Sequence, residues 1–169
     1  MPEILWAPWR LKYIERAPDP KGDANSSGDI FLDLPAEHED EKNLILFRGE
    51  VAFVMMNAFP YTNGHLLIAP YRQVAEIDVL NDEELTEINR LLARSIRWLR
   101  KAYRPDGFNV GVNLGSAAGA GIPIHVHWHV VPRWAGDTNF MSSIGDVRVM
   151  PQSLPDSYRR ILEVIDTRA

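Results

Sequence analysis

The sequence predicts an α+β fold built on an antiparallel sheet. Five short apolar segments have strand character, and one long amphipathic helix interrupts them. Gly49-Glu50 separates the first two segments in the way a hairpin turn does. Because strands come first, then a helix and then strands again, an antiparallel sheet with segregated helices is favoured over alternating βαβ units.

The expected elements follow in chain order. Residues 17–29 are rich in Pro, Gly, Asp and Ser and predict a loop. The expected strands are Asn43–Arg48, Val51–Asn57, His65–Pro70, Phe108–Leu114 and Ile124–Pro132. The expected helices are Asn81–Tyr103 and Leu154–Ile165.

The helix over residues 81–103 has the clearest pattern. Asn81 can cap it, and Glu84 follows three residues later, as in a capping box. Apolar residues then recur at intervals of three and four: Leu85, Ile88, Leu92, Ile96 and Leu99. This stripe predicts that one side of the helix is buried.

Length and composition bound the function. A chain of 169 residues fits one domain, which we expect over residues 30–169, with 1–29 as an N-terminal arm and loop and 142–169 as a C-terminal extension. No long uncharged apolar run is present and the first residues carry charges, so we expect no membrane span, no secretion signal and a cytoplasmic location. The net charge of −5 argues against nucleic acid as a partner, but a small anionic substrate remains open. The sequence has no cysteine, which excludes disulfides and thiolate metal sites.

Three of the five histidines stand at alternate positions in "GIPIHVHWHVVPRW". Side chains two apart on a strand share a face and lie ~6.6 Å apart. His125, His127 and His129 are therefore expected on one face. The other face carries the apolar residues between them, Val126, Trp128 and Val130. Three buried imidazoles without partners would cost free energy, so a functional row is favoured.

Three interpretations of this row compete. The histidines can be outward residues of a half-exposed strand, or they can bind a metal together with His65 or an acidic residue. The third interpretation is phosphate chemistry, because a neutral imidazole is a nucleophile near pH 7. The preceding loop, "NLGSAAGAGIP", favours the third, because glycine-rich backbone can approach an anion closely.

At these residues the sequence resembles the histidine triad (HIT) family of nucleotide hydrolases and transferases. "HVHWHVV" has the form His-φ-His-φ-His-φ-φ, where φ is apolar. "NAFPYTNGHLLIAP" resembles an earlier block of the family, and "NLGSAAGAG" stands where its phosphate loop does. "LWAPWRLKYI" and "VPRWAGDTNFM" resemble the subgroup of diadenosine-tetraphosphate phosphorylases and related adenylyltransferases.

The resemblance implies a role for each matching residue. His127 would attack the α-phosphorus and become a nucleotidyl-histidine, supported by His129 near the phosphate. His125 would brace the site, and His65 matches a fourth histidine of the family site. The implied substrate-binding residues are Asn57 at the ribose, Asn113 at the phosphate or leaving group, and Gly119, Ala120 and Gly121 in the phosphate loop.

Two departures from the family qualify this transfer. Some relatives bind a structural zinc, but Asp29, Leu32 and Gln73 stand where three of its ligands would fall, so we expect no metal. Other branches place Gln or Ser late in the phosphate loop, where this chain has Ala120 and Gly121. The proton for the leaving group must then come from a histidine, from solvent or from another segment.

The resulting expectation is a HIT-like fold with a five-stranded antiparallel sheet, one long helix and a C-terminal helix. We expect a homodimer, with the long helix, Val51–Asn57 or the C-terminal region at the contact. The expected activity is cleavage of a phosphoanhydride in an adenine nucleotide such as diadenosine tetraphosphate, without a cofactor. The alternatives are hydrolysis of nucleoside phosphoramidates, a nucleotide-binding regulatory role without turnover, and a metalloprotein.

Overall fold

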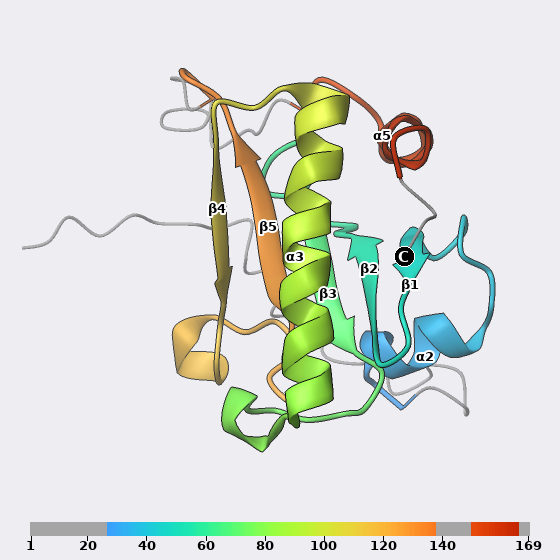
Figure 1. Ribbon diagram of the computed structural model, residues 1–169, viewed down its shortest axis with the longest axis vertical. Helices are drawn as coiled ribbons and strands as arrows, with labels where there is room; N and C mark the ends of the chain where they lie inside the picture. The colour runs from blue at the N-terminus through green and yellow to red at the C-terminus, as the bar shows by residue number, and fades with distance from the viewer. Residues whose placement is uncertain (1–26, 138–149, 166–169) are drawn as a thin grey trace, which may run out of the picture.

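The computed structural model describes residues 27–137 and 150–165, which form a five-stranded antiparallel sheet with helices on both faces (Figure 1). The strands are β1 (Ile45–Arg48), β2 (Ala52–Met56), β3 (Leu66–Pro70), β4 (Gly107–Val112) and β5 (Trp128–Arg133), in the spatial order β1-β2-β3-β5-β4. The helices are α2 (Ile30–Ala36), α3 (Asp82–Tyr103) and α5 (Leu154–Leu162), with short 3-10 turns η2 (Ile77–Val79) and η3 (Ser116–Ala118). The predicted fold class is confirmed. The expected arm before residue 27 and residues 138–149 lie outside the described residues.

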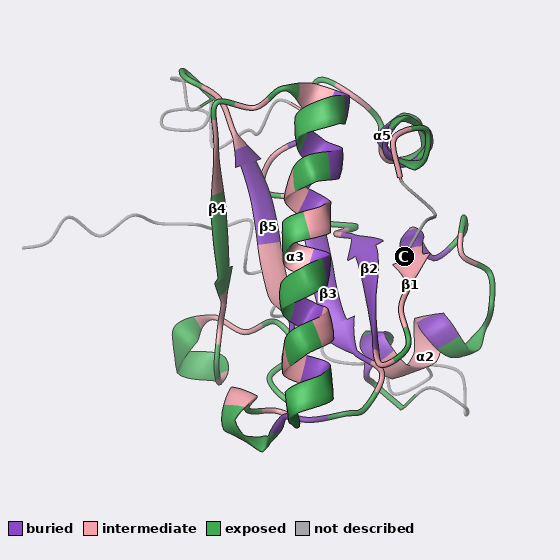
Figure 2. Cartoon of the chain, viewed as in Figure 1, coloured by how far each residue is buried: buried purple, intermediate pink, exposed green. Residues whose placement is uncertain are grey.

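The two faces of the sheet are covered by different helices. On one face, α3 and α5 close a large apolar cluster that includes Val54, Ile68 and Val130 from the sheet. On the other face, α2 places Phe31 in a smaller cluster with Phe53 and Leu67. Figure 2 shows β2 and β3 buried along their length while β4 is largely exposed. The sheet therefore has a closed centre and an open edge.

Helix α3 begins where the sequence predicts. The side chain of Asn81 accepts from the backbone N–H of Glu84, and the Glu84 carboxylate accepts from the backbone N–H of Asn81. Of the predicted stripe, Ile88 and Leu99 are buried, whereas Leu85, Leu92 and Ile96 are only partly buried. The deepest side also carries Leu91, Ser95, Trp98 and Ala102. The helix is thus rotated about its axis relative to the prediction, which leaves one apolar flank half-exposed.

The last strand starts later than predicted. We expected a strand over Ile124–Pro132, but β5 begins at Trp128, so only His129 of the histidine row lies within it. The register pairs Ile68 with Trp128, and Pro70, two residues further along β3, has no N–H to donate to the next rung. The Pro70 carbonyl instead accepts from Nε2 of His125 at 2.9 Å. A side chain therefore replaces the strand pairing beyond Trp128.

Helix α2 was not predicted. It has only seven residues and contains Pro35, so no helical periodicity is visible in the sequence. Asp29 caps it, with a carboxylate oxygen accepting from the backbone N–H of Phe31. The C-terminal helix α5 was predicted, although it ends at Leu162 rather than Ile165, and its Tyr158 hydroxyl donates to the carbonyl of Ile45. No helix among the described residues is long and apolar enough to cross a membrane.

Candidate active site

The fold brings four histidines together on the α2 face of the sheet. Leu67 and His129 are cross-strand partners, so His129 points to the same face as the cluster around Phe31. Nε2 of His65 lies 3.0 Å from Nδ1 of His129, and the rings of His127 and His129 are 5.0 Å apart. The alternation predicted for the histidine row therefore persists, although part of the row precedes the strand.

His127 is held in one tautomer by the backbone. Its Nδ1 lies 2.8 Å from the carbonyl oxygen of His125, which can only accept, so Nδ1 carries the proton. The lone pair is then on Nε2. Burial lowers the pKa of His127 below its ordinary value of 6.5, and this effect exceeds the opposing one of the hydrogen bond to His125. A neutral imidazole with a lone pair on Nε2 is the form that can attack an electrophile.

The tautomer of His65 is also fixed by the backbone. Nδ1 of His65 accepts from the backbone N–H of Tyr61 at 3.1 Å, and the amide nitrogen of Asn57 lies 3.3 Å from the same atom. Nε2 of His65 therefore carries the proton and donates to Nδ1 of His129. The neutral His129 ring must then carry its own proton on Nε2. The backbone N–H of Tyr61 thus determines which nitrogen carries the proton in His65 and, through His65, in His129.

Nε2 of His129 is a buried donor with no hydrogen-bond partner among the described residues. Burial, and then the charge of His127, lower the pKa of His129 to about 4, so the ring is neutral at pH 7. Its cross-strand partner on β4 is Gly111, where an added Cβ would meet no atom within 4 Å. An unsatisfied donor beside open space is the arrangement expected where a ligand atom completes the hydrogen bond.

His125 has acceptors at both ring nitrogens. Its Nε2 donates to the carbonyl of Pro70, and its Nδ1 lies 2.8 Å from a carboxylate oxygen of Asp29. Both side chains of this pair are fully buried. Because neither nitrogen is open, His125 is placed to support its neighbours and not to react. Asp29 was not predicted as a site residue, since it lies in a segment that we expected to be a loop.

The residues at the positions of a family zinc site do not fit that metal. The carboxylate of Asp29 already accepts from the Gln73 amide at 2.7 Å and lies against His125, while Leu32 offers no donor atom. An amide nitrogen is not a zinc ligand, and structural zinc normally takes four N, S or O donors. In residues 27–137 and 150–165, no group of three or more His, Cys, Asp or Glu side chains is arranged to hold a metal ion.

The glycine-rich loop lies between β4 and the histidine row. Gly115 and Gly119 adopt positive φ angles of 73° and 87°, which glycine accommodates without strain. The backbone N–H groups of Ala118, Gly119 and Ala120 donate to carbonyls within the loop, those of Gly115 and Ser116. Binding of phosphate by Gly119, Ala120 and Gly121 therefore stays a prediction. The loop does reach the site, because Ile122 packs against the cluster that contains Phe31.

The two predicted asparagines occupy different places. Asn113 follows β4 directly, and strand alternation places it in line with Asn109 and Gly111, on the face of His129. Asn57 is engaged with its neighbours, since its side-chain oxygen accepts from Phe59 N–H at 2.8 Å and its nitrogen lies 3.3 Å from Nδ1 of His65. Asn57 therefore supports His65, and its contact with a ribose stays a prediction.

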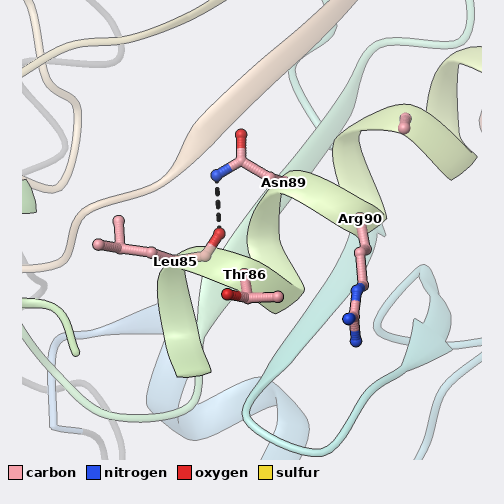
Figure 3. Close-up of a pocket in the computed structure, with 5 residues that line it drawn as sticks. Leu85, Thr86, Asn89 and Arg90 are labelled. Carbon is pink, nitrogen blue, oxygen red and sulfur yellow. Dashed lines mark hydrogen bonds between the residues drawn. The ribbon is translucent and has the colours of Figure 1, made fainter. Parts of the chain in front are cut away.

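A surface pocket elsewhere on the molecule lacks such chemistry. It is lined by one helix alone, through Leu85, Thr86, Asn89, Arg90 and Ala93 of α3 (Figure 3). Asn89 donates to the carbonyl of Leu85 at 2.7 Å and Arg90 points away from it (Figure 3). Because α3 covers the face of the sheet opposite the histidines, this pocket is separate from the candidate active site.

Comparison with known proteins gives the same family for the greater part of the chain. The sequence matches the HIT domain family over residues 37–136. A Mycobacterium tuberculosis protein named "AP-4-A phosphorylase" is 44% identical over 161 residues, which cover 94% of this chain and 81% of the relative.

Solved structures show the same fold. A hypothetical histidine triad nucleotide-binding protein from Sulfolobus tokodaii superposes with a TM-score of 0.64 at 21% identity, covering 80% of this chain and 90% of that one. A zinc-bound histidine triad family protein from Mycobacterium smegmatis gives a TM-score of 0.60 at 26% identity, covering 72% and 83% of the two chains. Both structures cover more than two thirds of this chain.

Proposed function

The chain belongs to the HIT family, and on this basis we propose that it cleaves a phosphoanhydride of an adenine dinucleotide such as diadenosine tetraphosphate. The observation that carries the proposal is the state of His127. Its Nδ1–H is bound to the carbonyl of His125, and its lowered pKa keeps the ring neutral, so Nε2 presents a lone pair at pH 7. The 44% identity to a protein named "AP-4-A phosphorylase" supports the substrate class.

In the first step, Nε2 of His127 forms a bond to the α-phosphorus. The bond from that phosphorus to the bridging oxygen breaks, and its electron pair leaves with the remaining polyphosphate. His127 then carries the nucleotidyl group, and its Nδ1–H remains on the carbonyl of His125. The positive charge that develops on the ring is stabilised by this hydrogen bond. Covalent catalysis of this kind divides one difficult substitution into two easier ones.

The state of His129 favours an anhydride over a phosphoramidate as substrate. With a pKa of about 4, His129 is a neutral hydrogen-bond donor at pH 7 and holds no proton in excess. The chain of bonds behind it ends at the backbone N–H of Tyr61, which cannot supply a proton. A polyphosphate can leave as an anion that accepts a hydrogen bond, whereas an amine must be protonated to leave.

The second step transfers the nucleotidyl group from His127 to an acceptor. Attack by water releases AMP, and attack by inorganic phosphate releases ADP; either one restores the neutral imidazole. Incubating the protein with diadenosine tetraphosphate, with and without inorganic phosphate, distinguishes the two. We expect ATP and ADP to form only when phosphate is present, as a phosphorylase requires. ATP and AMP in both mixtures would identify a hydrolase.

The same assay tests the alternatives from other classes. A protein that binds AMP but converts neither diadenosine tetraphosphate nor a nucleoside phosphoramidate would be a nucleotide-binding regulator. Turnover of the phosphoramidate alone would contradict the proposed substrate. Protein quenched during turnover in an alkaline denaturant, which preserves a P–N bond, should carry labelled nucleotide on His127, and absence of this label would contradict the covalent mechanism.

We also propose a homodimer formed through α3 and β4. Among the described strands, β4 pairs with β5 alone, and an exposed strand edge is normally covered in a native protein. Val110 on β4 is 45% exposed.

The half-buried flank of α3 carries Leu85, Leu92 and Ile96, and one turn further Arg100 lies over the Phe108 ring of β4. The open strand edge and the apolar flank are therefore adjacent and can be covered together. Val51–Asn57 is the least favoured of the three expected contacts in this proposal, because β2 is buried and paired on both edges.

Sedimentation of two matched variants tests this contact. Val110→Lys places a charge on the proposed interface, and we expect it to shift the protein from dimer to monomer. Leu162→Lys places the same charge on α5, where Leu162 is 39% exposed, and we expect it to remain dimeric. Dissociation by Leu162→Lys instead would assign the contact to the C-terminal region.

A further inference from the structure

A fully buried carboxylate lies behind the histidines, and the mechanism above does not use it. Oδ2 of Asp29 is 2.8 Å from Nδ1 of His125 and accepts from the Gln73 amide at 2.7 Å. Oδ1 accepts from the backbone N–H of Phe31 at 3.0 Å. Burying a carboxylate is costly unless its oxygens are hydrogen-bonded, and here three donor or ring nitrogens surround them. Such a group is retained at a cost and is expected to have a task.

The hydrogen bonds around His125 hold its ring from both sides. The carbonyl of Pro70 can only accept, so Nε2 of His125 carries a proton. A second proton then lies between Nδ1 and the carboxylate of Asp29. The ring is thus anchored to the end of β3 on one side and to the start of α2 on the other. This double anchor fixes the backbone at residue 125.

Two routes connect Asp29 to His127. By the first, the carbonyl of the anchored His125 accepts the Nδ1–H of His127 at 2.8 Å. By the second, Asp29 caps α2, and Phe31 of that helix packs on His127 with ring centroids 4.6 Å apart. Asp29 therefore holds both groups that position the His127 ring: the His125 carbonyl at its edge and the Phe31 ring on one face.

We propose that Asp29 is a positioning residue for the nucleophile. It holds the His125 ring, and through the carbonyl of His125 it keeps Nε2 of His127 directed at the phosphorus of the substrate. This inference rests on the function proposed above for His127. Asp29 precedes the residues that match the family, 37–136, so the match itself assigns it no role.

A matched pair of substitutions separates positioning from helix capping. Asp29→Asn and Asp29→Ser both leave an oxygen that can cap α2. Only the longer Asn side chain reaches His125, where its amide can donate to Nδ1 of a neutral imidazole once the Gln73 amide turns over and accepts with its oxygen. We expect kcat of Asp29→Asn to stay within about threefold of wild type, and kcat of Asp29→Ser to fall at least about tenfold, because small displacements of a reacting atom are costly. KM is expected to change little in either variant.

A second readout does not depend on turnover. The Nδ1–H proton of His127 is observed by NMR and assigned through its loss in His127→Asn. We expect its exchange with solvent to be at least about tenfold faster in Asp29→Ser than in wild type, and close to wild type in Asp29→Asn. If wild type does not cleave diadenosine tetraphosphate, the proposed function fails, while this measurement still decides the role of Asp29.

Three results would overturn the inference. Wild-type kcat and proton exchange in Asp29→Ser would reduce Asp29 to a helix cap. Equal losses in the Asn and Ser variants would mean that the charge matters and the contact with His125 does not. Should Asp29→Ser not fold, Gln73→Met removes one donor to Asp29 at an exposed position. We expect proton exchange at His127 to accelerate in Gln73→Met, and no change there would also overturn the inference.

Discussion

The two faces of the sheet bury polar groups in opposite ways. The α3 face is apolar, and the one buried side-chain polar atom there without a partner among the described residues is the hydroxyl of Ser95. On the α2 face, buried polar groups are linked by successive hydrogen bonds, such as those from Tyr61 to His65 and from His65 to His129. The atom there without a partner among the described residues is Nε2 of His129. Ser95 is enclosed by the helix and the core, whereas His129 lies across from the bare backbone of Gly111. The two unpartnered atoms therefore differ in their surroundings, and only that of His129 lies opposite a glycine with open space beside it.

The largest effect should come from removing the nucleophile on the polar face. His127→Asn is expected to lower kcat by roughly 10³-fold or more while AMP still binds, because the covalent step is lost. His38→Asn is the matched control, since His38 is exposed and its φ of 55° suits asparagine. Undiminished turnover in His127→Asn, measured by product formation, would exclude His127 as the nucleophile.

A substitution on the apolar face should affect stability and leave the chemistry intact. Leu99 is fully buried under α3, and Leu99→Ala is expected to cost about 2–5 kcal/mol of unfolding free energy through lost burial and a cavity. The remaining folded protein should keep its kcat. Urea unfolding measures the first quantity, and Leu162→Ala, at a position 39% exposed, is the control that should change little. A lowered kcat in folded Leu99→Ala would show that the two faces are coupled.

Acid should destabilise the protein through the histidine face before the carboxylates titrate. Burial lowers the pKa values of His127 and His129, the latter to about 4, so the unfolded chain binds more protons than the folded one below pH 6.5. The contribution of these two histidines to the unfolding free energy is therefore complete above pH 6.5 and is lost as the pH drops toward 4. The slope is at most about 1.4 kcal/mol per pH unit for each histidine. Urea midpoints between pH 7 and 4.5 measure this slope. His129→Asn should flatten it, and an equal slope in that variant would contradict the assignment.

Removing the other orphaned atom should be harmless. Ser95→Ala deletes a buried hydroxyl that has no partner among the described residues and introduces a better helix former. We expect the unfolding free energy to stay equal or rise by up to about 1 kcal/mol, with turnover unchanged. A loss of stability in the urea assay would reveal a hydrogen bond of Ser95 that the structure does not contain.

The smallest expected effect is that of metal removal. The donors of Asp29, Gln73 and His125 are engaged with one another and do not fit zinc. Dialysis against a chelator is therefore expected to change neither turnover nor the melting temperature. One zinc per chain in elemental analysis, lost together with stability on chelation, would contradict this expectation.

The sequence allowed the apolar face to be predicted better than the polar one. Periodicity and capping located α3 from Asn81 onward, because burial on one side of a helix leaves a regular pattern. The histidine row was also visible, since alternation and residue type were both unusual. The sequence drew attention to Asp29 only because it stands where some relatives have a zinc ligand. Its partner His125 is 96 residues away, and no local pattern records a contact between two distant segments.

The boundary of β5 was missed for a similar reason. Nothing in the segment before Trp128 opposes a strand, and the obstacle lies on the neighbouring strand, where Pro70 has no N–H. Helix α2 escaped prediction because its seven residues include Pro35 and depend on Phe31 for packing. These elements follow from tertiary contacts, which composition and periodicity do not encode.

Pro70 has one more consequence. By ending the ladder at Ile68 and Trp128, it leaves the stretch that bears His125 and His127 attached to β3 through an imidazole and not through main-chain pairs. That imidazole and the hydrogen bond from the Val126 N–H to the Val74 carbonyl at 2.6 Å hold the stretch, so the ring at position 127 is kept in place without a rung of the sheet. The placement of the nucleophile therefore depends on a side-chain contact that a single substitution can remove while the sheet stays intact.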